Sequence, residues 1–247
     1  MCRDSLSEAR ILLVDDEPIL LSIFGAWLGV LGEGKLRTAS NGQEALSAIV
    51  AQPVDVLITD VRMPIMDGVT LVRRLAKAGL TLRTIIFVSG FGDVDHKEMY
   101  SLGVEAFLAK PVRREELIDV LEKALAERAL LWSVPMPVAP RQSIRLEIEG
   151  SGESSFRLGR GGFCIRCPEP LSLGKVAFCC SFPGEQRSVT GQGYVRWYSK
   201  AEKTAGIELA FLSTDSRAWL SEWIAATKPL SFIPTFQEDT FPPRAES

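Results

Sequence analysis

The sequence predicts an α/β domain with a doubly wound parallel sheet, followed by a small, mostly β domain that ends in one helix. Three observations predict this. In the first half of the 247 residues, short apolar runs alternate with segments of helical period. The stretch WSVPMPVAP at 132–140, which holds three prolines, then interrupts the pattern. After it, short alternating runs are separated by glycine-bearing turns.

The first domain is expected to hold five parallel strands with helices on both faces, because five strand-like runs alternate with five helical segments. The strands are expected at 10–16, 35–40, 54–59, 83–89 and 105–109. The helices are expected at 18–32, 41–50, 67–79, 94–102 and 113–131, the third with Asp67 as its capping residue. The first helix is apolar nearly all round. Either its stripe of small residues simply packs closely on the sheet, or its outer face also meets the second domain or another subunit.

The predicted boundaries follow the shifts in pattern: a first domain at 1–131, a packed, semi-rigid linker at 132–140 and a second domain at 141–226. The second domain is expected to be a small antiparallel β-barrel or sandwich closed by a helix at 213–226. Its strands are expected at 144–149, 163–167, 175–182, 193–199 and 205–212.

The tail at 227–247 has four prolines and no hydrophobic period, so we expect disorder there. Its three phenylalanines, Phe232, Phe236 and Phe241, offer an alternative, in which the tail straps onto a surface of the protein.

Composition is that of a soluble globular protein, with 46% hydrophobic residues and a formal net charge of −3. This balance gives no reason to expect an anionic membrane or nucleic acid as partner. The N-terminus shows no basic run before an apolar core, and the longest uncharged stretch is shorter than the roughly 20 residues of a spanning helix. We therefore expect a cytoplasmic protein. Cys164 and Cys167 would point to opposite faces of a strand, which favours buried free thiols over a zinc site.

Charged and polar residues end or directly follow four of the expected strands. Asp15 and Asp16 end the first strand and Ser89 ends the fourth, while Asp60 follows the third and Lys110 the fifth. Because the carboxyl ends of parallel strands meet at one edge of the sheet, these side chains should converge. Crowded carboxylates need a cation, and Mg²⁺ accepts one or two carboxylates with waters and phosphate oxygens. The pattern therefore predicts a site for Mg²⁺ and a phosphoryl group.

The motifs ILLVDDEP, DVLITDVRMPIMDG, FVSGFGD and FLAKP resemble the receiver domain of two-component response regulators over residues 8–128. The resemblance implies a flavodoxin-like fold in which Asp60 is the phosphoacceptor. It also implies that Asp16 is the main Mg²⁺ ligand, assisted by Asp15 and by the backbone carbonyl of Arg62. Asp60 would attack a phosphohistidine of a sensor histidine kinase or phosphotransfer protein, with no enzymatic activity of its own beyond slow self-dephosphorylation.

The same resemblance implies a switch. A phosphoryl group brings about −1.5 to −2 charges, so Ser89 would swing towards it and Phe107 would turn inward into the space that Ser89 leaves. Lys110 would hold a phosphate oxygen, and the Lys110–Pro111 bond is a candidate cis peptide. Arg62 and Phe91 flank the path of an attacking water, and neither can orient it, which predicts a long-lived phosphoryl group.

The second domain begins with PRQSIR, which places Arg141 and Arg145 ahead of a strand, and continues with GGFCI and GQGYVRW. This ordered set resembles a PilZ domain, the small β-barrel family of cyclic di-GMP receptors. The resemblance implies that both arginines grip the nucleotide as bidentate forks. It also implies a second ligand-binding loop, which falls at 157–162 in this chain.

That second loop departs from the family pattern. It reads RLGRGG, with Arg157 where an Asp or Asn is expected and Gly159 where a Ser is expected, while Gly162 matches. A cation in place of an acceptor loses a hydrogen bond to guanine. Arg157 and Arg160 could instead add contacts to phosphate, so the sequence leaves nucleotide binding open.

The sequence therefore predicts a phosphorylation-dependent response regulator with a PilZ-type output, for which cyclic di-GMP is the candidate ligand. The alternative is a degenerate barrel that binds no nucleotide and acts as a protein-interaction or dimerisation module towards a downstream protein or a second copy. No helix-turn-helix and no basic stripe is visible, so DNA is not expected as a partner. A flavodoxin-like redox enzyme is disfavoured because DDEPI, after the first strand, would repel a phosphate.

Overall fold

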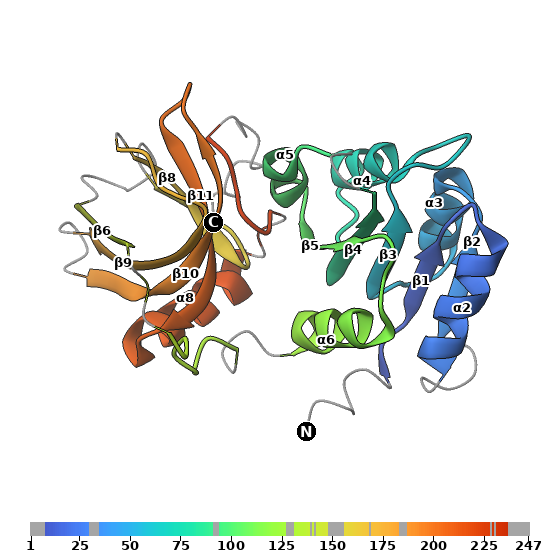
Figure 1. Cartoon of the computed structure of the whole chain (residues 1–247), viewed down its shortest axis with the longest axis horizontal. Coiled ribbons are helices and arrows are strands. Elements are labelled where there is room, and N and C mark those ends of the chain that lie inside the picture. Colours follow the sequence, from blue (N-terminus) through green and yellow to red (C-terminus); the bar gives the residue numbers. More distant parts are fainter. Residues whose placement is uncertain are drawn as a thin grey trace, which may run out of the picture. The chain divides into compact units, whose positions relative to one another are not determined.

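The computed structural model describes residues 8–29, 35–90, 94–126, 131–138, 140, 142–147, 156–167, 169–182, 187–227, 229 and 231–236. The chain divides into two compact units, whose elements are labelled in Figure 1. The first unit is Met1–Asp95 with Leu102–Glu127, and the second is His96–Ser101 with Arg128–Ser247. A short helix within the first half of the sequence is thus grouped with the second unit, which the sequence-based boundaries do not anticipate.

The first unit is built on a five-stranded parallel sheet, as the alternating pattern predicts. Its order is β2-β1-β3-β4-β5, and every neighbouring pair is parallel. Residues of β1, β3 and β4 are buried throughout because their uninterrupted apolar runs are covered on both faces of the sheet. The strands are β1 (Ile11–Val14), β2 (Leu36–Ala39), β3 (Val56–Asp60), β4 (Thr84–Ser89) and β5 (Val104–Ala109).

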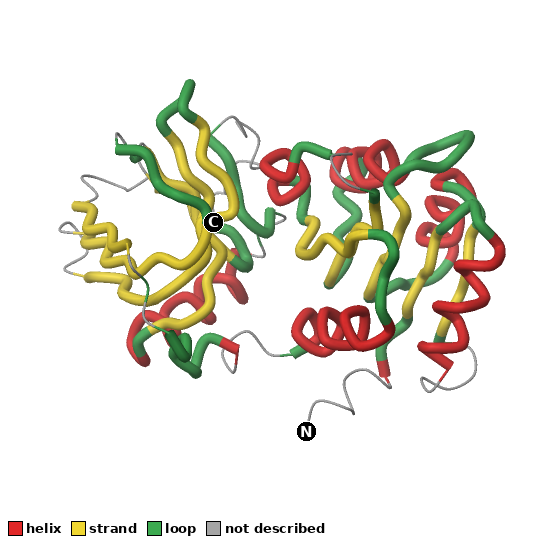
Figure 2. Tube along the Cα trace, viewed as in Figure 1, coloured by secondary structure: helices red, strands yellow, loops and turns green. Residues whose placement is uncertain are grey.

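Helices flank this sheet on both faces (Figures 1 and 2). On one face, buried side chains of α2 and α6 share a core cluster with alternate residues of the strands. Helix α4 begins as predicted, since the Asp67 carboxylate accepts a hydrogen bond from Thr70 N at 2.6 Å. The helices of this unit are α2 (Pro18–Leu28), α3 (Gly42–Ala51), α4 (Gly68–Lys77) and α6 (Arg114–Leu125).

Two helices differ in length from the prediction. Helix α2 ends at Leu28, whereas the apolar run predicts helix to residue 32. Helix α6 ends at Leu125 because Ala126 has an extended backbone, with φ −66° and ψ 154°, although its N–H still donates to Glu122 O. Residues 30–32 and 127–130 of the two predicted helices lie outside the described residues.

The second unit holds a six-stranded sheet in the order β6-β9-β10-β11-β8-β7. This sheet differs from the antiparallel barrel expected from the sequence. Strand β6 runs parallel to β9, and across the described residues the sheet does not close but has β6 and β7 at its edges. The prediction assumed that successive strands pair as antiparallel hairpins. A parallel pair needs a crossover connection instead, and the alternation of apolar residues does not distinguish the two directions. The strands are β6 (Gln142–Glu147), β7 (Phe156–Leu158), β8 (Gly162–Arg166), β9 (Gly174–Phe182), β10 (Arg187–Ser199) and β11 (Thr204–Leu212).

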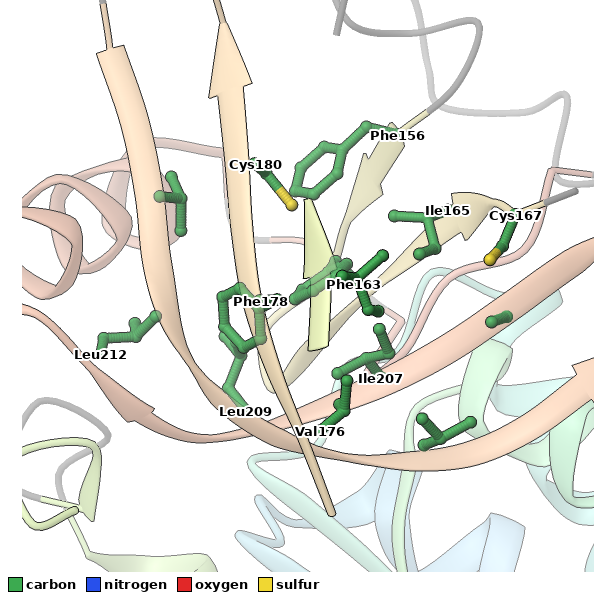
Figure 3. Close-up of a cluster of buried hydrophobic side chains, with 14 of the residues drawn as sticks. Phe156, Phe163, Ile165, Cys167, Val176, Phe178, Cys180, Ile207, Leu209 and Leu212 are labelled. Carbon is green, nitrogen blue, oxygen red and sulfur yellow. The ribbon is translucent and has the colours of Figure 1, made fainter. Parts of the chain in front are cut away.

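The strands of this sheet curve around an aromatic core, shown in Figure 3. Phe163 is 1% exposed, stacks with Phe156 at a ring distance of 5.2 Å and meets Phe178 edge-on at 4.9 Å. The predicted closing helix is present as α8 (Thr214–Thr227). Cys164, Cys167 and Cys180 are buried, as predicted, and form no disulfide.

The end of the described chain departs from the expected disorder. Residues 231–233 and 235 are buried, with Phe232 at 2% and Ile233 at 0% exposure. Their apolar side chains gain more from burial than the segment loses in conformational freedom. Residues 237–247, including Phe241, lie outside the described residues, as do Phe91 and Arg141. No described helix has the length and apolar character needed to cross a membrane.

Candidate functional site

Polar residues from four strands meet at the carboxyl edge of the parallel sheet. Asp60 and Ser89 end β3 and β4, while Asp15 and Lys110 follow β1 and β5 directly. Hydrogen bonds between neighbouring strands continue to these positions, with Lys110 N donating to Ser89 O at 2.8 Å and Asp15 N to Ala39 O at 3.2 Å. The convergence expected from the sequence is therefore present, and backbone pairing sets the position of each side chain.

The three carboxylates at this edge form one cluster. Asp15, Asp16 and Asp60 each offer an oxygen, and these atoms lie within 4.8 Å of one another. Asp15 is 1% exposed and Asp60 7%, whereas Asp16 is exposed to solvent. Among the described residues it is the cluster with the spacing of a metal site. Carboxylate oxygens are the donors that Mg²⁺ prefers, so the residues present fit this ion.

The ammonium group of Lys110 lies among the carboxylates. Its Nζ is 3.0 Å from Asp15 Oδ2 and 2.9 Å from Asp60 Oδ2. A further carboxylate, Glu17, is 3.8 Å away, a neighbour that the sequence analysis did not single out. One cation therefore offsets part of the negative charge of this edge, and it sits where it can contact any group placed on Asp60.

Burial and the neighbouring hydrogen bonds shift the pKa values of Asp15 and Lys110 in opposite directions. Burial raises the pKa of Asp15, although hydrogen bonds from Glu17 N and from Lys110 oppose the shift. Burial alone would lower the pKa of Lys110, but its hydrogen bonds to Asp60 and Asp15 outweigh it and leave that pKa raised. The lysine consequently keeps its positive charge across the physiological range.

The Asp60 carboxylate is held at both oxygens. Oδ1 accepts a hydrogen bond from Val61 N at 2.7 Å, and Oδ2 accepts one from Lys110. Behind it, a Cβ atom at Gly68 would collide with the Asp60 carbonyl oxygen, so only glycine allows α4 to start this close to the strand end. Gly68 was not predicted from the sequence, although the dipeptide DG after MPIM is a signal that could have pointed to it.

Two residues of the predicted switch flank the cluster. The Ser89 hydroxyl donates to Gly90 O at 2.7 Å. Phe107 on β5 is half-buried and meets Phe87 edge-on, with ring centroids 6.0 Å apart and planes at 83°. The Lys110–Pro111 bond is cis, as the sequence analysis anticipated. The backbone of Arg62 follows the Asp60 loop, with its N–H 3.5 Å from Asp60 Oδ1.

An apolar pocket of about 580 Å³ borders the cluster within the first unit. Helix α2 forms one wall through side chains that include Ile23, which is 39% exposed, and Ile19 on the same helix is 73% exposed outside the pocket. The outward apolar face that the sequence shows on this helix is therefore open to solvent within its own unit. The pocket is lined by Leu20, Ile23, Phe24, Trp27, Lys110, Pro111 and Val112.

The arginines predicted to bind a nucleotide are spread over the second unit. Arg145 lies exposed on β6 and Arg157 on β7, which are the two edge strands of the sheet. Arg160 lies in the turn between β7 and β8, and Gly162 begins β8. Arg141 lies outside the described residues.

Helix α5 (His96–Ser101) makes a polar contact within the second unit that the sequence gives no sign of. Lys97 Nζ is 2.6 Å from Glu202 Oε2, in the turn before β11, and 5.2 Å from the ring centre of Trp197. The pair lowers the pKa of the Glu202 carboxyl through its hydrogen bond from Lys97. Such a contact joins residues over a hundred positions apart, which no local pattern can reveal.

Comparison with known proteins agrees with the site in the first unit. A family model described as the response regulator receiver domain matches residues 11–122. The match ends before the strands of the second unit begin. A solved response regulator receiver domain protein from Clostridium thermocellum is 30% identical, with 50% of this chain and 98% of that one covered and a TM-score of 0.43.

Two curated relatives match the same region. The uncharacterized transcriptional regulatory protein YesN of Bacillus subtilis is 37% identical over 122 residues, which are 48% of this chain and 33% of YesN. The sensor histidine kinase RcsC of Salmonella typhimurium is 34% identical over 123 residues, which are 50% of this chain and 12% of RcsC. The chain thus spans a third or less of the length of these two relatives.

Proposed function

Residues 11–122 are a response regulator receiver domain, and from this premise we propose that the protein is a two-component response regulator phosphorylated on Asp60. One observation carries the proposal. Asp60 ends β3, the central strand of the matched receiver region, and its two oxygens accept hydrogen bonds from Val61 N and from Lys110 within the acidic cluster. Asp15 is held in the same way, by Glu17 N and Lys110, so its position at the end of β3 is what distinguishes Asp60. A fixed carboxylate with a cation at 2.9 Å is suited to attack a phosphorus atom and to keep the product charge balanced.

Each neighbouring residue has a separate role in this proposal. Asp15, Asp16 and Asp60, with the carbonyl of Arg62, would hold Mg²⁺, which supplies positive charge to the oxygens of the transferred group. Lys110 would exchange its contact with Asp60 Oδ2 for one with a phosphoryl oxygen. The Ser89 hydroxyl would leave Gly90 O to donate to another.

The phosphoryl donor in this proposal is a sensor histidine kinase or a phosphotransfer protein. The receiver match and the likeness to part of the sensor histidine kinase RcsC support a donor of this class. Ser89 moving towards the phosphoryl group would let the half-buried Phe107 turn inward. Because Arg62 and Phe91 offer no carboxylate or carboxamide to orient a water, we propose that the phosphoryl group is long-lived.

The test is phosphorylation of the full chain with a small phosphoryl donor such as acetyl phosphate, read by intact mass. The expected result is one Mg²⁺-dependent, alkali-labile adduct that is absent from Asp60→Asn and unchanged in Asp67→Asn, a carboxylate outside the cluster. An adduct on Asp60→Asn would overturn the assignment. A half-life of seconds for the purified phosphoprotein would contradict the proposed long lifetime while leaving Asp60 as the acceptor.

For the second unit we propose a protein-interaction output, with a PilZ-type cyclic di-GMP receptor as the competing function. The turn predicted to hold the nucleotide donates two of its backbone N–H groups to the chain itself: Arg160 N to Ser231 O and Gly161 N to Phe232 O, each at 3.0 Å. These two groups are therefore already bound by the chain itself. The arrangement therefore favours the interaction module.

Calorimetric titration with cyclic di-GMP distinguishes the two functions. We expect no heat at high ligand concentration. Micromolar binding that is lost in Arg141→Ala/Arg145→Ala would instead establish the nucleotide receptor and would require residues 231–236 to leave the turn. Lys175→Ala, on β9 of the same sheet, is the control for unspecific loss of charge.

A further inference from the structure

The turn between β7 and β8, residues 159–161, is covered by the chain's own segment 231–236. Ser231, Phe232 and Ile233 are 3%, 2% and 0% exposed. Two carbonyl groups of the segment accept hydrogen bonds from the N–H groups of Arg160 and Gly161. Residues 231–236 form neither helix nor strand, so contacts of this kind hold the segment, as they would hold a bound peptide.

Glycines make this approach possible. A Cβ atom at Gly159 would lie 2.7 Å from both Ser231 O and Phe232 O, and one at Gly162 would lie 2.8 Å from Ile233 Cγ1. At Gly161 it would overlap the ring of Phe232. Gly159 and Gly161 are therefore explained by the close approach of this segment, whereas a Cβ atom at Gly162 would lie closer still to Ile207 O of β11, at 2.3 Å.

The arginines around the turn lie over the aromatic rings of the segment. Arg160 Cζ is 5.8 Å from the ring centre of Phe232. Arg166 and Arg157 are 4.8 and 5.9 Å from the ring centre of Phe236. Such distances are those of cation–π contacts, which arginine makes through its flat face. These two phenylalanines, four residues apart, thus each meet a separate part of the arginine-lined surface.

Helix α5, which belongs to the same unit, contacts the other side of the segment. Tyr100 O accepts hydrogen bonds from Phe232 N at 3.0 Å and Ile233 N at 3.3 Å. The rings of Tyr100 and Phe232 stack with centroids 6.0 Å apart and planes at 26°. Phe232 is therefore held by its backbone N–H, its backbone carbonyl and its ring, which makes it the anchor of the segment.

We propose that this turn, with Arg157, Arg160 and Arg166, is a binding site for a short peptide with the pattern Phe-x-x-x-Phe, and that residues 231–236 occupy it in cis. The inference deepens the interaction role proposed for the second unit and is independent of Asp60 phosphorylation. Because the occupant is tethered closely behind α8, its effective concentration is on the order of mM. The site is masked until the segment is displaced.

The test uses the full chain and a fluorescent peptide of residues 229–237, PLSFIPTFQ. Phe232→Ala/Phe236→Ala removes both anchors of the cis segment and should bind the peptide, with wild type binding at least ~10-fold more weakly because its site is filled. Phe241→Ala, which changes a phenylalanine of the same tail outside the segment, should behave as wild type. A peptide with both phenylalanines replaced by alanine should not bind.

Gly161→Ala provides a second variant, since it leaves the segment intact and blocks the site itself. It should release the segment and still fail to bind the added peptide. Absence of binding to Phe232→Ala/Phe236→Ala, equal binding to that variant and wild type, or peptide binding to Gly161→Ala would each overturn the proposal. Phosphorylation of Asp60 reports on the first unit separately and is expected to be unchanged in all variants.

Hydrogen exchange of the wild-type chain tests whether residues 231–236 detach from the turn, without relying on any variant. If the segment detaches, the amides of Phe232, Ile233, Arg160 and Gly161 should exchange together and faster than amides in the centre of β10 and β11. Exchange of these four amides only at the rate of the core strands would show that the segment is a fixed part of the fold, and would overturn the proposal.

Discussion

The acidic edge of the first unit and the glycine turn of the second differ in how their parts are brought together. At the acidic edge, each side chain comes from the end of a strand, so parallel pairing alone makes Asp15, Asp60 and Lys110 meet. At the glycine turn, residues 159–161 contact the segment 231–236, which lies about seventy residues later in the chain and is not positioned by strand pairing. Repeating topology thus makes the first region predictable from sequence, and irregular packing makes the second unpredictable.

The largest expected effect tests whether the acidic edge of the first unit keeps its activity when the second unit is destabilised. Phe163→Ala should lower the stability of the second unit by about 3–5 kcal/mol, because it empties the centre of the aromatic core. Denaturant unfolding followed by tryptophan fluorescence measures this. The acidic cluster lies wholly in the first unit, so Mg²⁺-dependent phosphorylation should persist. If Phe163→Ala lost phosphorylation together with the stability of its second unit, the acidic edge would depend on the second unit.

The next effect concerns the lysine at the acidic edge. Lys110→Met removes the cation 2.9 Å from Asp60 and should slow phosphorylation by about 100-fold or more, since a preorganised charge is lost where negative charge develops. The rate of adduct formation by intact mass gives the measurement. Lys77→Met, on the exposed end of α4, is the matched control and should keep the wild-type rate. A wild-type rate in Lys110→Met would exclude the proposed role.

A smaller effect compares two glycines of the first unit. Gly68→Ala should destabilise the protein by about 1–3 kcal/mol, because its Cβ would overlap the carbonyl of Asp60 and the backbone must shift. Gly29→Ala meets nothing within 4 Å and has helical dihedral angles, so it should be neutral or slightly stabilising. Thermal unfolding of both variants measures the difference. Equal effects would mean that the contact at Gly68 is not under strain.

The smallest effect is a pH dependence in the first unit. Arg10 hydrogen-bonds the Asp55 carboxylate at 2.7 and 2.8 Å and holds its pKa below the usual range. The folded state thus binds this proton less well than the unfolded state, so the pair stabilises the protein above the unfolded pKa of about 3.9. The stabilisation disappears as pH falls through the lower, folded pKa. Asp55→Asn should therefore lower Tm slightly at pH 7, and by less at pH 2.

A pH titration of Tm for wild type and Asp55→Asn checks this sign. Curves that stay equally far apart at pH 2 and pH 7 would show that the substitution acts through packing. The pair is partly exposed and screened by salt, so its effect should shrink at high ionic strength.

Sequence patterns predicted much of the first unit because its rules are local. Alternating apolar runs predicted five parallel strands, and the residues at the strand ends predicted the acidic cluster with Lys110. Helix ends were less predictable: α6 stops at Leu125 because the backbone of Ala126 turns away, which no periodicity encodes. Gly68 was missed because its importance depends on a backbone atom of Asp60.

The sequence by itself determined the parallel sheet and the charge at its edge, because both follow from hydrophobic period and strand order. Only the tertiary structure decided that β6 pairs in parallel with β9, that α5 is grouped with the second unit and that residues 231–236 fill the RLGRGG turn. Those arrangements depend on the fit of surfaces distant in sequence. Contacts of this kind leave no repeat or spacing in the chain by which they could be recognised in advance.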